Sequence, residues 1–71
     1  MSFGQSLQAA MEDKGIKQEE LAKGVDKKQA TISGYVNDKI DPGLSTVKKI
    51  AKFLDMSTSE LLDYKKAATD E

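Results

Sequence analysis

Apolar side chains recur at steps of three and four residues along most of this 71-residue chain, and no long stretch alternates apolar with polar residues. This spacing places apolar side chains on one face of a helix, so the sequence predicts an all-α protein. A first helix is predicted over about 2–14, and Gly15 ends it because glycine readily adopts the left-handed conformation that closes a helix. The apolar face of this helix consists of Phe3, Leu7, Ala10 and Met11.

Three more apolar stripes follow the first. A second segment begins at Ile16, and its apolar face consists of Leu21, Ala22 and Val25. A third helix is predicted over roughly 28–37, with an apolar face of Ile32, Tyr35 and Val36. The fourth and longest stripe consists of Leu44, Val47, Ile50, Ala51 and Leu54. Turn signals at 37–39 and 41–43 separate the last two helices.

The segment 57–60 has the pattern of a capping box, in which the Ser57 hydroxyl accepts from the Glu60 amide and the glutamate reaches back. A short fifth helix then carries Leu61, Leu62 and Tyr64. We expect a compact five-helix bundle that forms one domain over 1–65, followed by a flexible tail over 66–71.

Composition excludes several classes of function. The chain has no cysteine and no histidine, so it lacks disulfides, thiolate ligands, the commonest metal ligand and the usual general base. We therefore expect a binding module rather than an enzyme, without metal, cofactor or small-molecule ligand. No apolar run approaches the ~20 residues that span a membrane, so we expect a cytoplasmic protein.

Charge is distributed unevenly along the chain. Residues 14–52 carry nine lysines against five acids, whereas the rest carries two lysines against seven acids, and the net charge is −1. A basic middle favours a polyanionic partner, although a solvated surface of mixed sign explains it equally well. Every cation is lysine, so no guanidinium group is present to contact guanine or phosphate in a bidentate manner.

The most informative stretch is QEELAKGVDKKQATISGY, residues 18–35. Ala22 is small enough to let a second helix approach closely, and three apolar residues would hold the two helices at a fixed angle, as a helix-turn-helix requires. These residues are Leu21, Val25 and Ile32. The third helix then turns an uncharged face outward, which consists of Gln29, Ala30, Ser33, Gly34 and Asn37. Such a face suits a helix that lies in the major groove of DNA.

The chain resembles the Cro/CI-type helix-turn-helix family, also called lambda-repressor-like or XRE. The residues that carry the resemblance are GIKQEELA at 15–22, ATISGYVN at 30–37, a P-x-L-x-T-V-x-K-I-A-x-x-L pattern at 42–54 and S-x-x-E-L-L at 57–62. The resemblance implies a transcriptional regulator that binds specific double-stranded DNA. It further implies a repressor that binds an inverted-repeat operator as a homodimer, with helix 28–37 in the major groove.

The resemblance also implies roles for individual residues. Gln18 matches a glutamine that contacts phosphate and braces a second glutamine, and Gln29 matches that second position, from which it would bind adenine N6 and N7. The expected base-contacting residues are Lys28, Gln29, Ala30 and Ser33. The expected phosphate-contacting residues are Lys17, Gln18, Lys27, Asn37 and Lys39.

Several alternatives stay open at this stage. Asp26 stands where the family has glycine, so the turn bends either at Asp26 or at Gly24. Gly34 either permits close approach to DNA or marks a groove contact that is not made. The two glutamines could merely cap helix ends, and Ser33 could bond only within its own helix.

Packing roles are also open. Tyr35 and Phe53 are expected in the core rather than stacked on bases. Met56, Leu61 and Leu62 belong either to the core or to a dimer seam. The alternative function is a protein-interaction module on the same fold, antitoxin-like or anti-repressor, with weak or no DNA binding.

Overall fold

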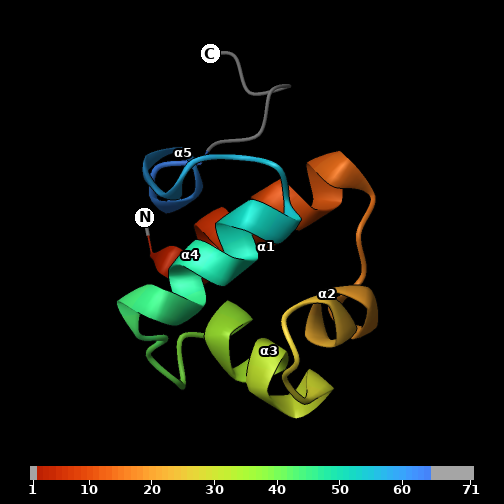
Figure 1. The fold of residues 1–71 in the computed structure, drawn as a ribbon. Coiled ribbons are helices and arrows are strands. Elements are labelled where there is room, and N and C mark those ends of the chain that lie inside the picture. The colour runs from red at the N-terminus through yellow and green to blue at the C-terminus, as the bar shows by residue number, and fades with distance from the viewer. Residues whose placement is uncertain (1, 65–71) are drawn as a thin grey trace.

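The computed structural model describes residues 2–64, which form five α-helices and no strand (Figure 1). The helices are α1 (Phe3–Lys14), α2 (Gln18–Gly24), α3 (Gln29–Val36), α4 (Leu44–Phe53) and α5 (Thr58–Leu62). The predicted all-α, five-helix architecture is therefore confirmed. The predicted tail over 66–71 lies outside the described residues.

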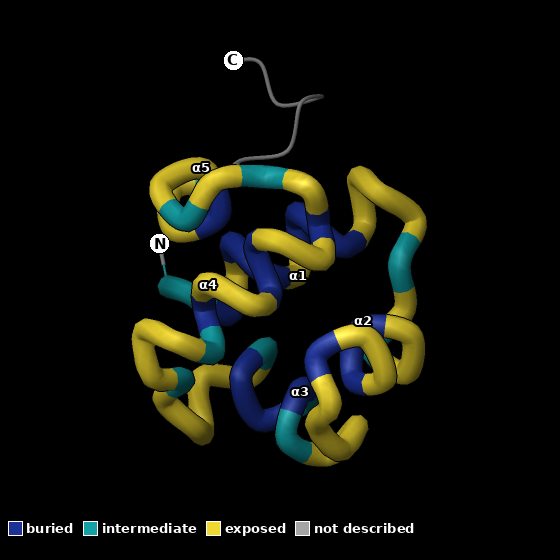
Figure 2. Tube along the Cα trace, viewed as in Figure 1, coloured by how far each residue is buried: buried dark blue, intermediate teal, exposed yellow. Residues whose placement is uncertain are grey.

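The helices surround one apolar core. In Figure 1 α4 lies in front of α1, with α5 above them and α2 and α3 below. α1 contacts α3 and α5, and α4 contacts α2 and α5. The fully buried large side chains come from all five helices or their caps, and Figure 2 shows the buried segments facing inward. They are Leu7, Leu21, Ile32, Ile50, Leu54 and Leu61. The apolar stripes therefore do share a common centre, as a domain of this size requires for its stability.

The first four helices end in the same way. Residues in the left-handed conformation follow them, and these are Gly15 (φ 68°), Asp26 (φ 58°), Asp38 (φ 58°) and Asp55 (φ 59°). After each, the next backbone N–H donates to the carbonyl five residues earlier, as Lys27 does to Ala22 at 2.8 Å. This Schellman arrangement satisfies carbonyls that the helix end would otherwise leave unpaired. The turn between α2 and α3 thus bends at Asp26, while Gly24 is the last residue of α2.

The beginning of α1 packs against the end of α3. A Cβ atom at Gly4 would collide with the backbone carbonyls of Tyr35 and Val36, so only glycine fits there. The Gly4 N–H donates to the Asp38 carboxylate at 3.1 Å. This bond gives a tertiary partner to an N-terminal amide that has none within its own helix.

The capping box at the start of α5 is confirmed. The Ser57 hydroxyl accepts from Glu60 N at 3.1 Å, and the Glu60 carboxylate accepts from Ser57 N at 3.0 Å. Beyond α5, the Tyr64 hydroxyl donates to Asp13 at 2.8 Å. This hydrogen bond, with some burial and the nearby negative charges, raises the pKa of Tyr64 above its usual value of 10.0.

Two apolar residues do not lie where their helical spacing suggested. Leu44 is 63% exposed, because it is the first residue of α4 and its side chain lies beyond the edge of the core. Phe53 is 40% exposed and not in the core, since its ring covers Gly24 on the surface of α2. Tyr35 is buried, as expected.

The ambiguity at the last helix is resolved in favour of the core for two residues. Leu61 is fully buried, and Met56 is half-buried against the same core. Leu62 is 50% exposed, so it alone of the three is placed to take part in a seam between two molecules.

Candidate nucleic-acid interface

α2 and α3 form a helix-turn-helix with a fixed geometry. Leu21, Ala22 and Val25 from α2 and its cap are buried against Ile32 of α3. The turn is fixed by the left-handed Asp26 and by the Lys27–Ala22 backbone bond described above. The packing that the sequence predicted for these residues is confirmed, and it leaves the opposite side of α3 facing outward.

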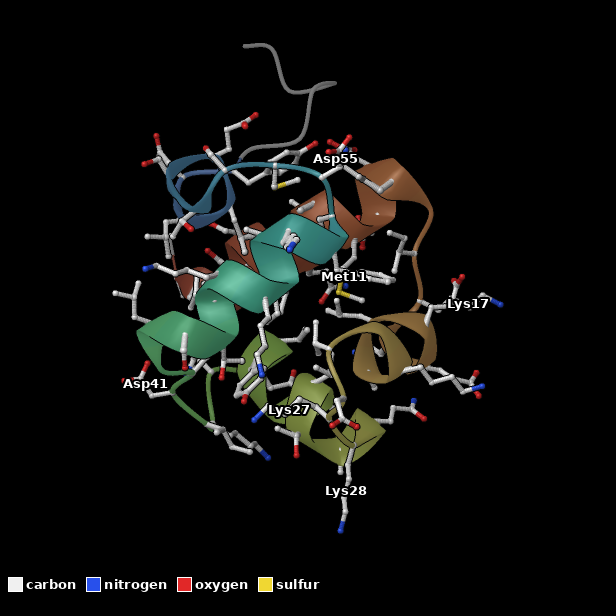
Figure 3. All side chains as sticks on the ribbon, in the orientation of Figure 1. Met11, Lys17, Lys27, Lys28, Asp41 and Asp55 are labelled. Atoms are coloured by element: carbon white, nitrogen blue, oxygen red, sulfur yellow. The ribbon has the colours of Figure 1, made fainter. Side chains whose placement is uncertain are left out.

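The first turn of α3 is the most exposed part of this helix. Lys28 is the N-cap residue, and it supplies its backbone carbonyl to the N–H groups of Thr31 and Ile32 without a side-chain cap. Lys28, Gln29 and Ala30 are all exposed, whereas Ser33 is half-buried. Figure 3 shows the Lys28 side chain extending away from the body of the protein. No residue within α3 itself is charged, so its outward surface presents only an amide, a methyl group and a hydroxyl.

The expectation that Gly34 leaves this outward face open is wrong. Gly34 is buried, because the side chain of Ile40 covers the position where its Cβ would be. A Cβ at Gly34 would lie 2.5 Å from Cδ1 and 2.8 Å from Cγ1 of Ile40. The missing side chain therefore makes room for another residue of the same chain.

The C-terminal end of α3 is held by hydrogen bonds between Asn37 and Ser33. The side-chain amide of Asn37 donates to the Ser33 carbonyl at 2.9 Å and to the Ser33 hydroxyl at 3.3 Å. Ser33 thus does bond within its own helix, as the more conservative interpretation held. The Ser33 hydroxyl acts as the acceptor in this contact, so its proton stays available for donation.

Gln18 and Gln29 line the same shallow hollow, which α1, α2 and α3 enclose. Gln18 is the first residue of α2 and is half-buried, and Lys17 beside it is exposed. The Lys17 N–H donates to the Glu20 carboxylate at 3.0 Å, which caps α2. Glu12 and Glu19 line the same hollow, so its charge is mixed rather than basic.

The remaining lysines lie at the two ends of α3. Lys27 is exposed in the turn before α3, and Lys39 is exposed in the loop after it. α3 has eight residues and is therefore about 12 Å long. Lys27 and Lys39, at its two ends, can each lie at one edge of a DNA groove. The structure thus brings Gln18, Gln29 and Lys17 together, while Lys39 stands apart from them at the far end.

Sequence reasoning missed two residues that shape this surface. Asp38 was assigned only to a turn, yet it bonds to Gly4 of α1. Ile40 was not considered at all. The available clue was that an aliphatic residue stands between two polar turn signals, six positions after a glycine within a helix. Both contacts join residues that local patterns do not connect.

Neither a metal-binding cluster nor a membrane-spanning helix is found in the part of the chain that the structure describes. Residues 2–64 contain no cluster of three or more acidic, histidine or cysteine side chains able to hold a metal ion. None of the helices within that range has both the length and the apolar character needed to cross a lipid bilayer.

Comparison with known proteins identifies the family of the chain and shows which solved structures share its fold. The sequence model of the helix-turn-helix family matches residues 7–61, which is more than half of the chain and includes α2, the turn and α3. Among curated protein sequences, none matches significantly.

Several solved structures share the fold. The DNA-binding domain of the P22 c2 repressor is similar with a TM-score of 0.86 at 23% identity, over 99% of this chain and 92% of that one. The restriction-modification controller protein C.AhdI from Aeromonas hydrophila gives a TM-score of 0.81 at 30% identity, over 84% and 91% of the two chains. The biofilm regulator SinR, solved in complex with DNA, gives 0.78 at 26% identity, over 86% and 98%.

Proposed function

Because the chain belongs to the helix-turn-helix family of Cro/CI type, we propose that it is a transcriptional regulator that binds a specific double-stranded DNA sequence. Two of the similar structures are a restriction-modification controller protein and a regulator in complex with DNA, at 30% and 26% identity. The observation that carries the proposal is the exposed, uncharged first turn of α3, a helix whose opposite side packs against α2.

In this proposal α3 enters the major groove and contacts base edges through its first turn. Gln29 offers its amide to adenine N6 and N7, and Ala30 contacts a thymine methyl group. Lys28 and Ser33 extend the same set of contacts on either side. The absence of charge within α3 suits this role, since fixed donors and acceptors rather than net charge distinguish base pairs.

The phosphate backbone is contacted by polar and basic groups around α3. These residues are Lys17, Gln18, Lys27, Asn37 and Lys39. With only three lysines in this set and carboxylates at Glu12 and Glu19 nearby, we expect weak affinity for random DNA. Recognition then depends on base contacts more than on charge.

We further propose that the protein acts as a homodimer on an inverted repeat and represses by occupying its site. Two symmetry-related copies of α3 would enter the major groove about 34 Å apart, one turn of DNA. The exposed Leu62 on α5 offers an apolar contact for the seam between the two copies. Repression by occupancy needs no second domain.

Selection of binding sites from random duplexes tests the proposal most directly. We expect an enriched inverted repeat whose half-sites contain adenine and thymine at fixed positions. The enriched duplex should bind far more tightly than a scrambled duplex at about 100 mM salt. Equal binding of the two duplexes would contradict the proposal.

One observation favours a second candidate function. Glu12 and Glu19 line the hollow that holds Gln18 and Gln29, and carboxylates at this place repel phosphate. A module that binds a protein partner, antitoxin-like or anti-repressor, would tolerate them. Such a module would show no enriched duplex in the selection and would capture one defined protein instead.

A further inference from the structure

The side chain of Ile40 occupies the place on α3 where a side chain of residue 34 would begin. A Cβ built on Gly34 would lie 2.5, 2.8 and 3.3 Å from Cδ1, Cγ1 and Cβ of Ile40. The contact comes from the loop after α3 rather than from the helix itself. It therefore adds a large aliphatic group to a helix surface that the sequence leaves bare.

This position lies on the outward side of α3. Ala30 and Gly34 are four residues apart, so they lie one above the other on the same face of the helix. Side chains on a helix lean toward its N-terminus, and a group above Gly34 therefore lies over the turn that leads back to Ala30. Ala30 is exposed. Ile40 thus continues the exposed row that Ala30 begins.

The backbone holds Ile40 in this position. The N–H groups of Lys39 and Ile40 both donate to the Gly34 carbonyl, at 2.8 and 3.1 Å. The left-handed Asp38 directs the chain back over the helix, and its carboxylate is bonded to Gly4 of α1. The loop is thereby fixed to two helices at once.

Ile40 is nevertheless not part of the core. Its side chain remains 45% exposed, and it is absent from the buried apolar cluster and from the residues packed against it. Asp41, which follows, lies toward the start of α4 and points away from α3 in Figure 3. An aliphatic tip therefore stands free on the surface that we assign to the major groove.

We infer that Ile40 is a specificity-determining residue that contacts a thymine methyl group in the major groove, an inference that rests on the proposed function. Ile40 has no side-chain donor or acceptor, and the thymine C5-methyl is the apolar feature that the major groove presents. Gly34 lies about 6 Å along α3 from Ala30. The methyl group that Ile40 contacts is thus about two base-pair steps from the one beside Ala30, for a helix that follows the groove.

The test uses the full chain and the duplex enriched by the selection described above. Each thymine of one half-site is replaced in turn by deoxyuridine, which removes only the methyl group. Wild-type protein should lose about fourfold in affinity at the position beside Ile40, the amount expected for one buried methyl group. Ile40→Ala should bind the thymine and deoxyuridine duplexes equally at that position, and Ile40→Val should give an intermediate ratio.

Two controls separate this effect from general damage. Leu44→Ala removes an exposed aliphatic side chain from the first residue of α4, and it should keep the wild-type response to every deoxyuridine. Ile40→Ala should also retain its response at the position beside Ala30, which shows that α3 still docks. If Ile40→Ala responds to every deoxyuridine as the wild type does, the inference is wrong and the proposed function stands. If the selection enriches no sequence, both the proposed function and the contact of Ile40 are wrong.

Discussion

The Asp38 carboxylate accepts a hydrogen bond from the Gly4 N–H at 3.1 Å, across 34 positions of the chain. The same Asp38 holds the left-handed conformation that ends α3. One residue therefore closes α3, binds an amide in the first turn of α1 and directs the loop that carries Ile40. Asp26 and Asp55 share the conformation but belong to other turns, which makes them natural controls.

Replacing a left-handed aspartate by glycine should stabilise the protein where the carboxylate has no tertiary role. We expect Asp26→Gly to raise the free energy of unfolding by up to about 1 kcal/mol, because glycine adopts this conformation without strain. Asp38→Gly relieves the same strain but loses the bond to Gly4, which offsets the gain by about 1.5 kcal/mol or more. Urea denaturation measures both. Equal stabilisation by the two substitutions would show that the Gly4 bond contributes nothing.

Gln29→Ala and Lys39→Ala should affect DNA binding in different ways. Gln29→Ala removes a base contact, so discrimination at one adenine should fall by about 1–3 kcal/mol while other positions keep theirs. Lys39→Ala removes a phosphate contact, so it should weaken all duplexes alike and lower the slope of log affinity against log salt by about one. Titrations of matched and mismatched duplexes at several salt concentrations separate the two. A uniform loss from Gln29→Ala would place that residue on the backbone instead.

Glu19→Gln should strengthen DNA binding. Glu19 lines the hollow shared by Gln18 and Gln29, so its charge opposes a phosphate near Gln18. Removing one exposed charge should improve affinity about two- to fivefold at low salt and less at high salt. Asp63→Asn makes the same change in charge at the end of α5, away from α3, and should have little effect. A gain as large from Asp63→Asn would show that only net charge matters.

Gly34→Ala should have opposite effects on stability in two backgrounds. Alanine in a helix is favoured over glycine by about 1 kcal/mol, but in the wild type its Cβ would collide with Ile40. We therefore expect destabilisation in the wild type and stabilisation of up to about 1 kcal/mol when Ile40 is already alanine. A double-mutant cycle in urea measures this coupling. Additive effects would mean that Ile40 does not lie over Gly34 in solution.

Tyr64→Phe should lower stability at neutral pH but not at high pH. The Asp13 carboxylate accepts the Tyr64 hydrogen bond and raises the pKa of Tyr64 above 10.0. A raised folded-state pKa means that the contribution is fully present below pH 10.0 and is lost as the pH rises through the folded value. Thermal unfolding should thus give a lower Tm for Tyr64→Phe at pH 7, and the difference should disappear above the raised pKa. A difference independent of pH would argue for lost packing of the hydroxyl.

Local sequence was sufficient for the parts of the fold that depend on neighbours along the chain. The helix stripes, the Gly15 stop and the Ser57–Glu60 capping box follow from residues at most four positions apart. The helix-turn-helix was also predictable, since Leu21, Val25 and Ile32 pack within one short segment.

Residues whose environment is set by distant segments were not predictable in this way. Leu44 has an apolar spacing, yet within residues 2–64 no other element covers the start of α4. From the sequence, Gly24 and Asp26 were equally suitable for the bend. The contact that covers Gly24 comes from Phe53 of α4, which local sequence does not connect to the turn. Gly34 was assigned to an open face because its cover, Ile40, comes from a loop whose path depends on the contact between Asp38 and Gly4.

The position of Ile40 also bears on protein engineering. A graft of α3 alone into another scaffold would transfer Gln29 and Ala30, but it would leave Gly34 uncovered in the middle of the surface that contacts the bases. The transplanted segment has to run through Ile40, and the recipient has to present a backbone amide where Gly4 stands, so that the loop returns along the same path.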